Sequence, residues 1–136
     1  MSNEKKKLSG IEAVALERQR QIEQKGFTTE HDMLHMDDQL VYGAICYAYP
    51  PKNRRLVKLR EEDSGGLPVV HLKDGPDGEA DYIVLPPSIW PFKREAFRPD
   101  TSGTVRGRMR DIEKAAAMLV AEYDRLAATL DDAEGA

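Results

Sequence analysis

The stretch "RMRDIEKAAAMLVAEYDRLAATL", residues 108–130, carries the strongest structural signal in the sequence. Its apolar residues recur at intervals of three and four, the spacing that places side chains on one face of an α-helix. The stripe consists of Ile112, Ala115, Ala116, Leu119, Val120, Tyr123, Leu126, Ala127 and Leu130. The pattern predicts a long amphipathic helix over 106–130, and its small alanine side chains would allow a second helix to approach closely.

A second helix is predicted over 10–25, near the N-terminus. Ser9 can cap it, Glu12 completes a capping box, and Gly26 marks its end. Its apolar residues fall roughly on one face, and they are Leu8, Ile11, Ala15 and Ile22. The second half of this helix is strongly polar, which suits either a solvated helix or one that lines a polar cleft.

A third helix is predicted over 37–49. Its apolar residues lie at helical spacing, and they are Leu40, Val41, Ala44, Ile45 and Ala48. Pro50 and Pro51 end it, because proline cannot continue the helical hydrogen bonding. Cys46, the one cysteine of the chain, lies inside this apolar run. We expect it to be a buried structural thiol rather than a reactive one.

The middle of the chain differs from these helical segments. Two short β-type runs, Val69–Leu72 and Asp81–Leu85, flank the strong turn signal Asp74–Gly78. They predict a hairpin over 67–86, inserted between helices. We expect Trp-Pro-Phe, residues 90–92, to pack the following connection onto the helical core; stacking of the tryptophan on a nucleic-acid base is the alternative.

Together these elements predict a mainly α fold, a helical bundle of three principal helices with a small inserted β-hairpin. We expect one domain over 1–136, with a flexible lead-in at 1–9 and a flexible tail at 131–136. Three helices make a thin core for a chain of this length. We therefore expect a homodimer that completes the bundle, with the last helix as the interface.

Composition narrows the class of function. A net charge of −4 argues against general affinity for nucleic acid or acidic membranes. The basic run Lys52–Arg60 could touch an acidic partner or nucleic acid, but three acids follow at once and neutralise much of it. The N-terminus lacks the pattern of a signal peptide, and no apolar run approaches the ~18 residues of a membrane span. We expect a cytoplasmic protein.

Four segments together resemble a family of small phage and prophage proteins. They are "ERQRQIEQKGFTTEHD" (17–32), "DDQLVYGAICYAYP" (37–50), "WPF" (90–92) followed by Phe97-Arg98-Pro99, and "IEKAAAMLVAEYDRL" (112–126). Their order and spacing are similar to the family's pattern over more than half of the chain. Some members are described as similar to MazG-like, all-α nucleotide pyrophosphohydrolases. Such enzymes cleave nucleoside triphosphates to monophosphate and pyrophosphate, using magnesium.

The resemblance implies a magnesium site built from carboxylates, the ligands that suit this hard cation. MazG-type sites carry Glu-x-x-Glu and Glu-x-x-Asp, and neither motif occurs in this sequence. Other acids at the end of the first helix and just after it would have to take their place. On this hypothesis Glu30, Asp32 and Asp38 hold the metal, and Glu17 acts with Glu30 and Asp32 in catalysis.

The same hypothesis gives Arg18 and Lys25 the role of offsetting phosphate charge, although an ion pair is the more common fate of an arginine on such a helix. The implied ligand is a nucleotide or another small phosphate compound. Two functions of different class stay open. One is a magnesium-dependent pyrophosphohydrolase, and the other is a non-catalytic phage accessory protein that binds a host protein or sequesters a small nucleotide. An exposed hairpin edge would favour the second, because it could recruit a strand.

The stretch "GFTTEHDMLHMDD", residues 26–38, has two further interpretations. His31 and His35 are four residues apart, so on a helix they would point the same way, as zinc ligands do. In the other interpretation the segment is a polar turn. Thr28 or Thr29 would begin a short helical turn, and the two histidines would hydrogen-bond locally. Asp32 and the pair Asp37 and Asp38 would cap helices.

Overall fold

The computed structural model describes residues 8–25, 38–60 and 64–134 of the chain. Within these ranges the helices are α1 (Gly10–Lys25), α3 (Gln39–Ala48) and α4 (Val105–Glu134). The strands are β1 (Leu56–Lys58), β2 (Val69–Gly75) and β3 (Gly78–Val84), and two 3-10 turns are η1 (Pro51–Asn53) and η2 (Arg94–Ala96). The described part is therefore rich in helix and carries a small antiparallel sheet.

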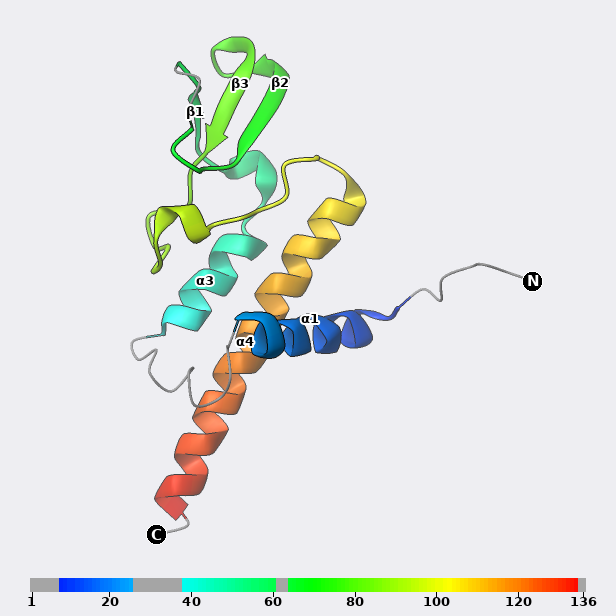
Figure 1. The fold of residues 1–136 in the computed structure, drawn as a ribbon, viewed down its shortest axis with the longest axis vertical. Helices are drawn as coiled ribbons and strands as arrows, with labels where there is room; N and C mark the ends of the chain where they lie inside the picture. Colours follow the sequence, from blue (N-terminus) through cyan, green and yellow to red (C-terminus); the bar gives the residue numbers. More distant parts are fainter. Residues whose placement is uncertain (1–7, 26–37, 61–63, 135–136) are drawn as a thin grey trace, which may run out of the picture.

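Figure 1 shows how these elements are arranged around α4. α3 lies beside the first half of α4, and α1 crosses α4 near its middle. The sheet lies beyond the end of α3, near the start of α4. No helix within the described ranges is long and apolar enough to cross a membrane. The homodimer stays a prediction, because the structure contains one chain.

The three predicted helices are present, with shifted ends. α1 has the predicted bounds, and α3 lies inside the predicted range 37–49. α4 does not end at residue 130 but continues to Glu134, so most of the predicted tail at 131–136 is helical. The long apolar and alanine-rich run favours helix up to the last few residues, where no glycine or proline stops it before Gly135.

The predicted N-terminal cap is present at α1 and absent at α3. The N–H of Glu12 donates to Ser9 Oγ and the N–H of Ser9 donates to Glu12 Oε1, both at 3.2 Å, so the capping box is confirmed. Asp38 has a positive φ of 62° and its side chain makes no capping hydrogen bond, so its predicted capping role is wrong. In the left-handed conformation its backbone sets the direction in which α3 begins.

The sheet contains the predicted hairpin and one strand that was not predicted. β3 lies in the centre, with β2 and β1 antiparallel on its two sides. β1 pairs Leu56 with Val84 and Lys58 with Tyr82. It covers three residues within a basic run, which is too short to show the alternation of a strand in the sequence. Its pairing with β3 is what forms it.

Tyr82 closes the hairpin at its turn. Its ring is fully buried, and its hydroxyl donates to the carbonyl oxygen of Gly78 at 2.6 Å and accepts from the N–H of Asp77 at 2.9 Å. A Cβ at Gly75 would lie 2.2 Å from this ring, so the close approach requires glycine there. The turn is therefore held by a buried side chain as well as by its backbone.

The core lies between α3 and α4. Its buried members are Leu40, Ala44, Cys46, Tyr47, Val84, Phe97, Ala115, Met118 and Ala121. Gly43 lets the two helices approach, since a Cβ there would lie 2.4 Å from Met118 Cε. Trp90 and Phe92 pack against this cluster, with the Trp90 ring edge-on to Tyr47 at 5.7 Å between centroids. The predicted packing of residues 90–92 and the buried thiol are confirmed.

α1 presents its polar residues, not its apolar ones, to α4. Glu17, Arg18 and Gln21 are buried, whereas Ile11 is 86% exposed and Leu16 is 54% exposed. Leu8, just before the helix, and Ala15 and Ile22 are likewise exposed, whereas Ala13 and Val14 are partly buried. Of the two interpretations of its polar half, the structure therefore supports a helix that lines a polar contact.

Candidate functional site

Glu17, a predicted catalytic acid, is buried between α1 and α4. Its Oε1 accepts from Arg20 Nε at 2.8 Å and pairs with Arg110 Nη1 at 2.7 Å, and its Oε2 accepts from Arg20 Nη2 at 3.1 Å and Gln21 Nε2 at 3.3 Å. Burial raises the pKa of this carboxyl, but the hydrogen bonds and charges of the two arginines outweigh it and hold the pKa below the ordinary 4.5. Metal binding by Glu17 would require these contacts to be exchanged.

Of the predicted substrate-binding cations, the structure describes the side chain of Arg18 but not that of Lys25. Arg18 is buried on α1, and its Nη2 lies 3.6 Å from Asp124 Oδ2 of α4. Lys25 is the last residue of α1, and its side chain lies outside the described part. Arg18 therefore has the structural role of an inter-helix ion pair, and its role in binding phosphate stays a prediction.

The predicted metal ligands are only partly covered by the structure. Glu30 and Asp32 lie outside the described residues, as do His31 and His35. Asp38 is exposed at the start of α3. Within the described ranges no group of three or more His, Cys, Asp or Glu side chains could hold a metal ion. The magnesium site and the zinc alternative both stay predictions.

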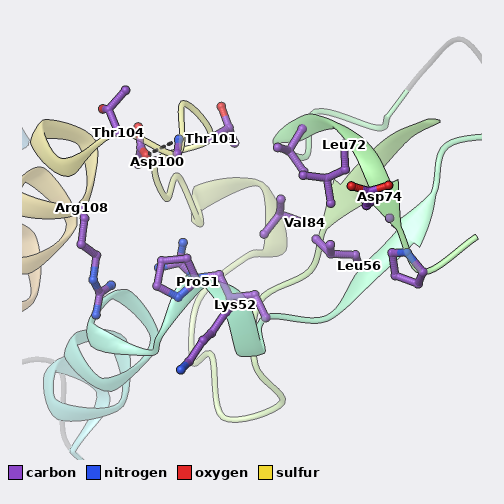
Figure 2. Close-up of a pocket in the computed structure, with 15 residues that line it drawn as sticks. Pro51, Lys52, Leu56, Leu72, Asp74, Val84, Asp100, Thr101, Thr104 and Arg108 are labelled. Atoms are coloured by element: carbon purple, nitrogen blue, oxygen red, sulfur yellow. Dashed lines mark hydrogen bonds between the residues drawn. The ribbon is translucent and has the colours of Figure 1, made fainter. Parts of the chain in front are cut away.

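A pocket opens elsewhere, between the sheet and the start of α4 (Figure 2). Its volume is about 570 Å³, within the ~300–1,000 Å³ of small-molecule sites. Residues from three places line it: the chain just after α3, one face of the sheet, and the loop at 100–104 before α4. One wall of this pocket is apolar and the opposite wall is polar, so it suits a ligand with two chemically different ends.

The apolar wall is one face of the sheet. Leu56 of β1 stands opposite Val84 of β3, and Val70 and Leu72 follow at alternate positions of β2. Residues two apart on a strand point to the same side, which places these four side chains together. Figure 2 shows Leu56, Leu72 and Val84 on this side of the pocket. The wall can cover a planar or aliphatic group of a ligand.

The polar wall includes a tightly hydrogen-bonded loop. Asp100 accepts from Ser102 Oγ at 2.7 Å and from the N–H of Gly103 at 3.1 Å. Burial raises the pKa of Asp100, but these hydrogen bonds outweigh it, so the pKa lies below the ordinary 3.8. Thr104 Oγ1 accepts from the N–H of Gly107 at 3.0 Å and so caps α4. The loop is therefore a preformed part of the pocket.

A buried ion pair supports this loop from behind. Arg54 Nη2 lies 3.3 Å from Asp111 Oδ2, and both side chains are almost fully buried. Asp111 Oδ1 also accepts from the N–H of Asp100 at 2.9 Å, and Arg54 Nη2 donates to the carbonyl oxygen of Tyr47 at 3.2 Å. The pair thus ties together the end of α3, the loop and α4. Arg54 Nε is buried and has no hydrogen-bond partner within the described ranges.

Arg108 closes the pocket where α3 ends and α4 begins. Its Nη1 donates to the carbonyl oxygens of Tyr47 and Tyr49 at 3.1 Å and 3.2 Å, and its Nη2 donates to that of Ala48. These are the last carbonyls of α3, which carry the negative end of the helix dipole. The position of Arg108 is therefore fixed by α3, and its charge is largely occupied there.

The pocket offers donors that the protein itself leaves unused. Lys52 is exposed at its edge and makes no ion pair within the described residues. Thr101 contributes an exposed hydroxyl. Asp74 supplies an exposed carboxylate at the sheet side. A donor group facing an apolar wall favours a ligand with an anionic end and an apolar body.

Two residues of this pocket, Lys52 and Arg54, lie in the basic run Lys52–Arg60. The acids that follow this run were expected to neutralise much of it, so the run did not predict the pocket. The pairing of Arg54 with Asp111 joins residues 57 positions apart, which no local pattern reveals. The succession Asp100-Thr-Ser-Gly-Thr is typical of a side-chain-capped turn before a helix, and this signal could have identified the polar wall.

Comparisons with protein-family models, curated proteins and solved structures found no match for this chain.

Proposed function

We propose that the protein binds a small ligand with an anionic group and an apolar ring, a nucleotide in the first instance, in the pocket between the sheet and α4. The observation that carries this proposal is the cation at the pocket edge facing an apolar wall. Lys52 is exposed there and makes no ion pair within the described ranges. An anionic ligand entering the pocket would supply its partner, while the apolar body of the ligand would cover the sheet face.

The other lining residues fit the same kind of ligand. Lys52 would attract the anionic group at the pocket edge, and Thr101 would donate a hydroxyl hydrogen bond to it. The sheet face formed with Val70 and Leu72 would cover the ring of a base. Asp74 would accept from a ribose hydroxyl or an exocyclic amine. This is a binding function, and it requires no metal.

Binding can be tested by titrating the 15N-labelled protein with ATP, AMP, adenosine and inorganic phosphate. We expect saturable shifts of amides in the loop 100–104 and along β2, with AMP or ATP tighter than phosphate or adenosine alone. Shifts that gather on α1 or α3, or no saturation with any of the four compounds at millimolar concentration, would argue against this pocket.

Two variants distinguish the binding of the anionic group of the ligand from the binding of its apolar ring. Lys52→Met removes one charge and should weaken the binding of ATP and phosphate about tenfold, since a charge-assisted hydrogen bond contributes roughly 1.5–3 kcal/mol. Leu72→Ala should weaken nucleotide and adenosine but not phosphate. Lys73→Met is the matched control for Lys52→Met, because Lys73 is also an exposed lysine but lies on β2 and does not line the pocket. Equal effects of Lys52→Met and Lys73→Met would contradict the proposal.

Hydrolysis of nucleoside triphosphates is a separate prediction that rests on the family resemblance. Purified protein incubated with magnesium and each common ribo- and deoxyribonucleoside triphosphate should then release pyrophosphate. The double variant Asp32→Ala, Asp38→Ala should lose that release. No release above this variant would exclude the predicted catalytic role of these acids and would leave the binding function unaffected.

A further inference from the structure

α4 carries an apolar stripe that no described element covers. The stripe begins with Val105, Met109 and Ile112 and continues with Ala116 and Leu119. Tyr123, Leu126 and Leu130 complete it, and we call these eight residues the α4 seam. Apart from Ala116, which is partly exposed, their exposed fractions lie between 43% and 79%.

The seam lies on a side of α4 that neither α1 nor α3 covers. Successive helical residues are about 100° apart, and on that scale the arc of the seam contains none of the buried positions Asp111, Ala115, Ala117, Met118 and Ala121. Asp111 pairs with Arg54, and Ala115, Met118 and Ala121 belong to the core cluster that includes α3. In Figure 1 the second half of α4 also extends beyond α3 and the sheet. Neither neighbouring helix can therefore cover the seam.

The spacing of the seam indicates what covers it. Its residues follow one another at steps of four and three without interruption from Val105 to Leu130. This repeat of 3.5 residues is the pattern by which two helices pair along their whole length. A helix that only packs on a globular core shows a wider stripe with a period of 3.6. The seam is therefore suited to a second long helix with the same repeat.

The order of residues in the seam fits a second copy running in the opposite direction. In that arrangement Val105 meets the partner's Leu130, and Met109 meets the partner's Leu126. At the centre Ile112 meets the partner's Tyr123, and the small Ala116 meets the partner's Leu119. Every seam residue then has an apolar counterpart, and the smallest residue, Ala116, is compensated by a larger one.

A parallel pair would match less well. It would place Ala116 against the partner's Ala116, which leaves space in the contact, and Tyr123 against the partner's Tyr123, which brings two hydroxyls together. It would also align the two helix dipoles, whereas an antiparallel pair opposes them. Side-chain size, polarity and dipole therefore all favour the antiparallel arrangement.

The extent of the seam suits a stable dimer. It is about 38 Å long, at ~1.5 Å per residue. Two copies bring sixteen side chains to the contact, and these need to lose on average only about 60 Å² of accessible surface each to reach the ~1,000 Å² of a specific interface. We propose that two chains associate through their α4 seams as an antiparallel helix pair, with Ala116 of each against Leu119 of the other.

Mass measurement tests the association. Light scattering on the purified chain at micromolar concentration should give twice the 15.3 kDa of one chain. The double variant Leu119→Glu, Leu126→Glu should give the monomer mass with unchanged helix content by circular dichroism. Leu16→Glu is the control: this residue is 54% exposed on α1 and lies outside the seam, so the dimer should persist. A monomeric wild-type chain would overturn the proposal.

Cross-linking tests the direction. Met109→Cys and Leu126→Cys are made separately and oxidised mildly, alone and mixed; buried Cys46 can stay. In the antiparallel pair the two copies of position 109 are about 25 Å apart along the axis, at ~1.5 Å per residue. Only the mixture should therefore form a disulfide-linked dimer. Cross-linking of either variant alone would show a parallel pair, and an absence of cross-links would show no contact; both results contradict the proposal.

Discussion

α4 is held by two helices in opposite ways. Its contact with α3 is apolar and closely packed, and Gly43 lets Met118 approach the backbone of α3. Its contact with α1 is ionic. Glu17 of α1 lies 2.7 Å from Arg110, and Arg18 lies 3.6 Å from Asp124.

The two contacts have different roles: the apolar contact stabilises the fold, and the ionic contact positions α1 on α4. Apolar burial is non-directional and contributes most of the free energy of folding. In each of these ion pairs one side chain is buried and the other is partly exposed. The cost of desolvation therefore offsets much of the attraction, yet the pair fixes the geometry of the groups that form it. We therefore infer that α3 and α4 form the stable centre of the molecule. α1 is positioned on α4 by charge, and changes that leave the core intact can loosen it.

The largest expected effect is on the apolar contact. Met118→Ala removes a buried side chain that Gly43 and its neighbours cannot refill, so the free energy of unfolding should fall by about 2–5 kcal/mol. Urea denaturation followed by circular dichroism measures it. Leu16→Ala, at a position 54% exposed on α1, should change it by less than about 0.5 kcal/mol. Similar losses for both variants would contradict the special role of the α3–α4 contact.

A smaller effect is expected at the ionic contact. Glu17→Gln removes the shared partner of Arg20 and Arg110, whose side chains are 32% and 38% exposed and can stay hydrated. The expected loss is about 1–2 kcal/mol, below that of a fully buried pair. Hydrogen exchange should show faster opening of α1 with α3 unchanged. Glu23→Gln, an exposed change on the same helix, is the control. Equal loss of protection in α1 and α3 would contradict the inference that α1 can loosen while the α3–α4 core stays intact.

Acid should distinguish the two contacts without mutation. The pKa of Glu17 lies below its ordinary value of 4.5 in the folded chain. Its contribution to stability is therefore present above about pH 4.5 and is lost as the pH falls through the lowered pKa. Amide protection of α1 should decline over that window relative to α3, and the relative decline should be absent in Glu17→Gln. A relative decline that persists in this variant would assign the effect to another group.

The smallest effect on stability is expected for an ionic contact between side chains that are all exposed. On the hairpin His71 Nδ1 lies 2.8 Å from Asp81 Oδ1, and its Nε2 lies 3.3 Å from Glu79 Oε1. These hydrogen bonds raise the pKa of His71 above 6.5. Any stabilisation is complete below the unfolded pKa and is lost as the pH rises through the raised value. Titration of the ring protons by NMR should show the raised pKa, and Asp81→Asn should lower it.

The fold was predictable where its signals are local. The helices follow from apolar spacing, the start of α1 from the Ser9–Glu12 capping box, and the hairpin from its glycine- and aspartate-rich turn. β1 was not predictable, because three residues become a strand only by pairing with β3. The buried face of α1 was also hidden, since periodicity of apolar residues indicates an amphipathic helix but not which face its neighbours cover.

The candidate site was less predictable than the fold. Its polar wall depends on contacts between distant parts of the chain, such as Arg54 with Asp111 and Arg108 with the end of α3. The sequence analysis favoured the acid-rich segment 26–38 instead, because density of carboxylates is visible in a sequence whereas a pocket is not. The basic run and the capped loop were visible separately, and only the fold brings them to one place.

The buried Cys46 has a practical consequence for experiments on this chain. It is the one cysteine of the sequence, it lies in the core between α3 and α4, and burial raises its pKa to about 11. A thiol reagent can reach it only in molecules whose helix pair has separated, because the protonated and enclosed sulfur is unreactive. The rate of its labelling under native conditions therefore counts these rare opening events. The chain therefore carries its own reporter for them, and no cysteine has to be introduced.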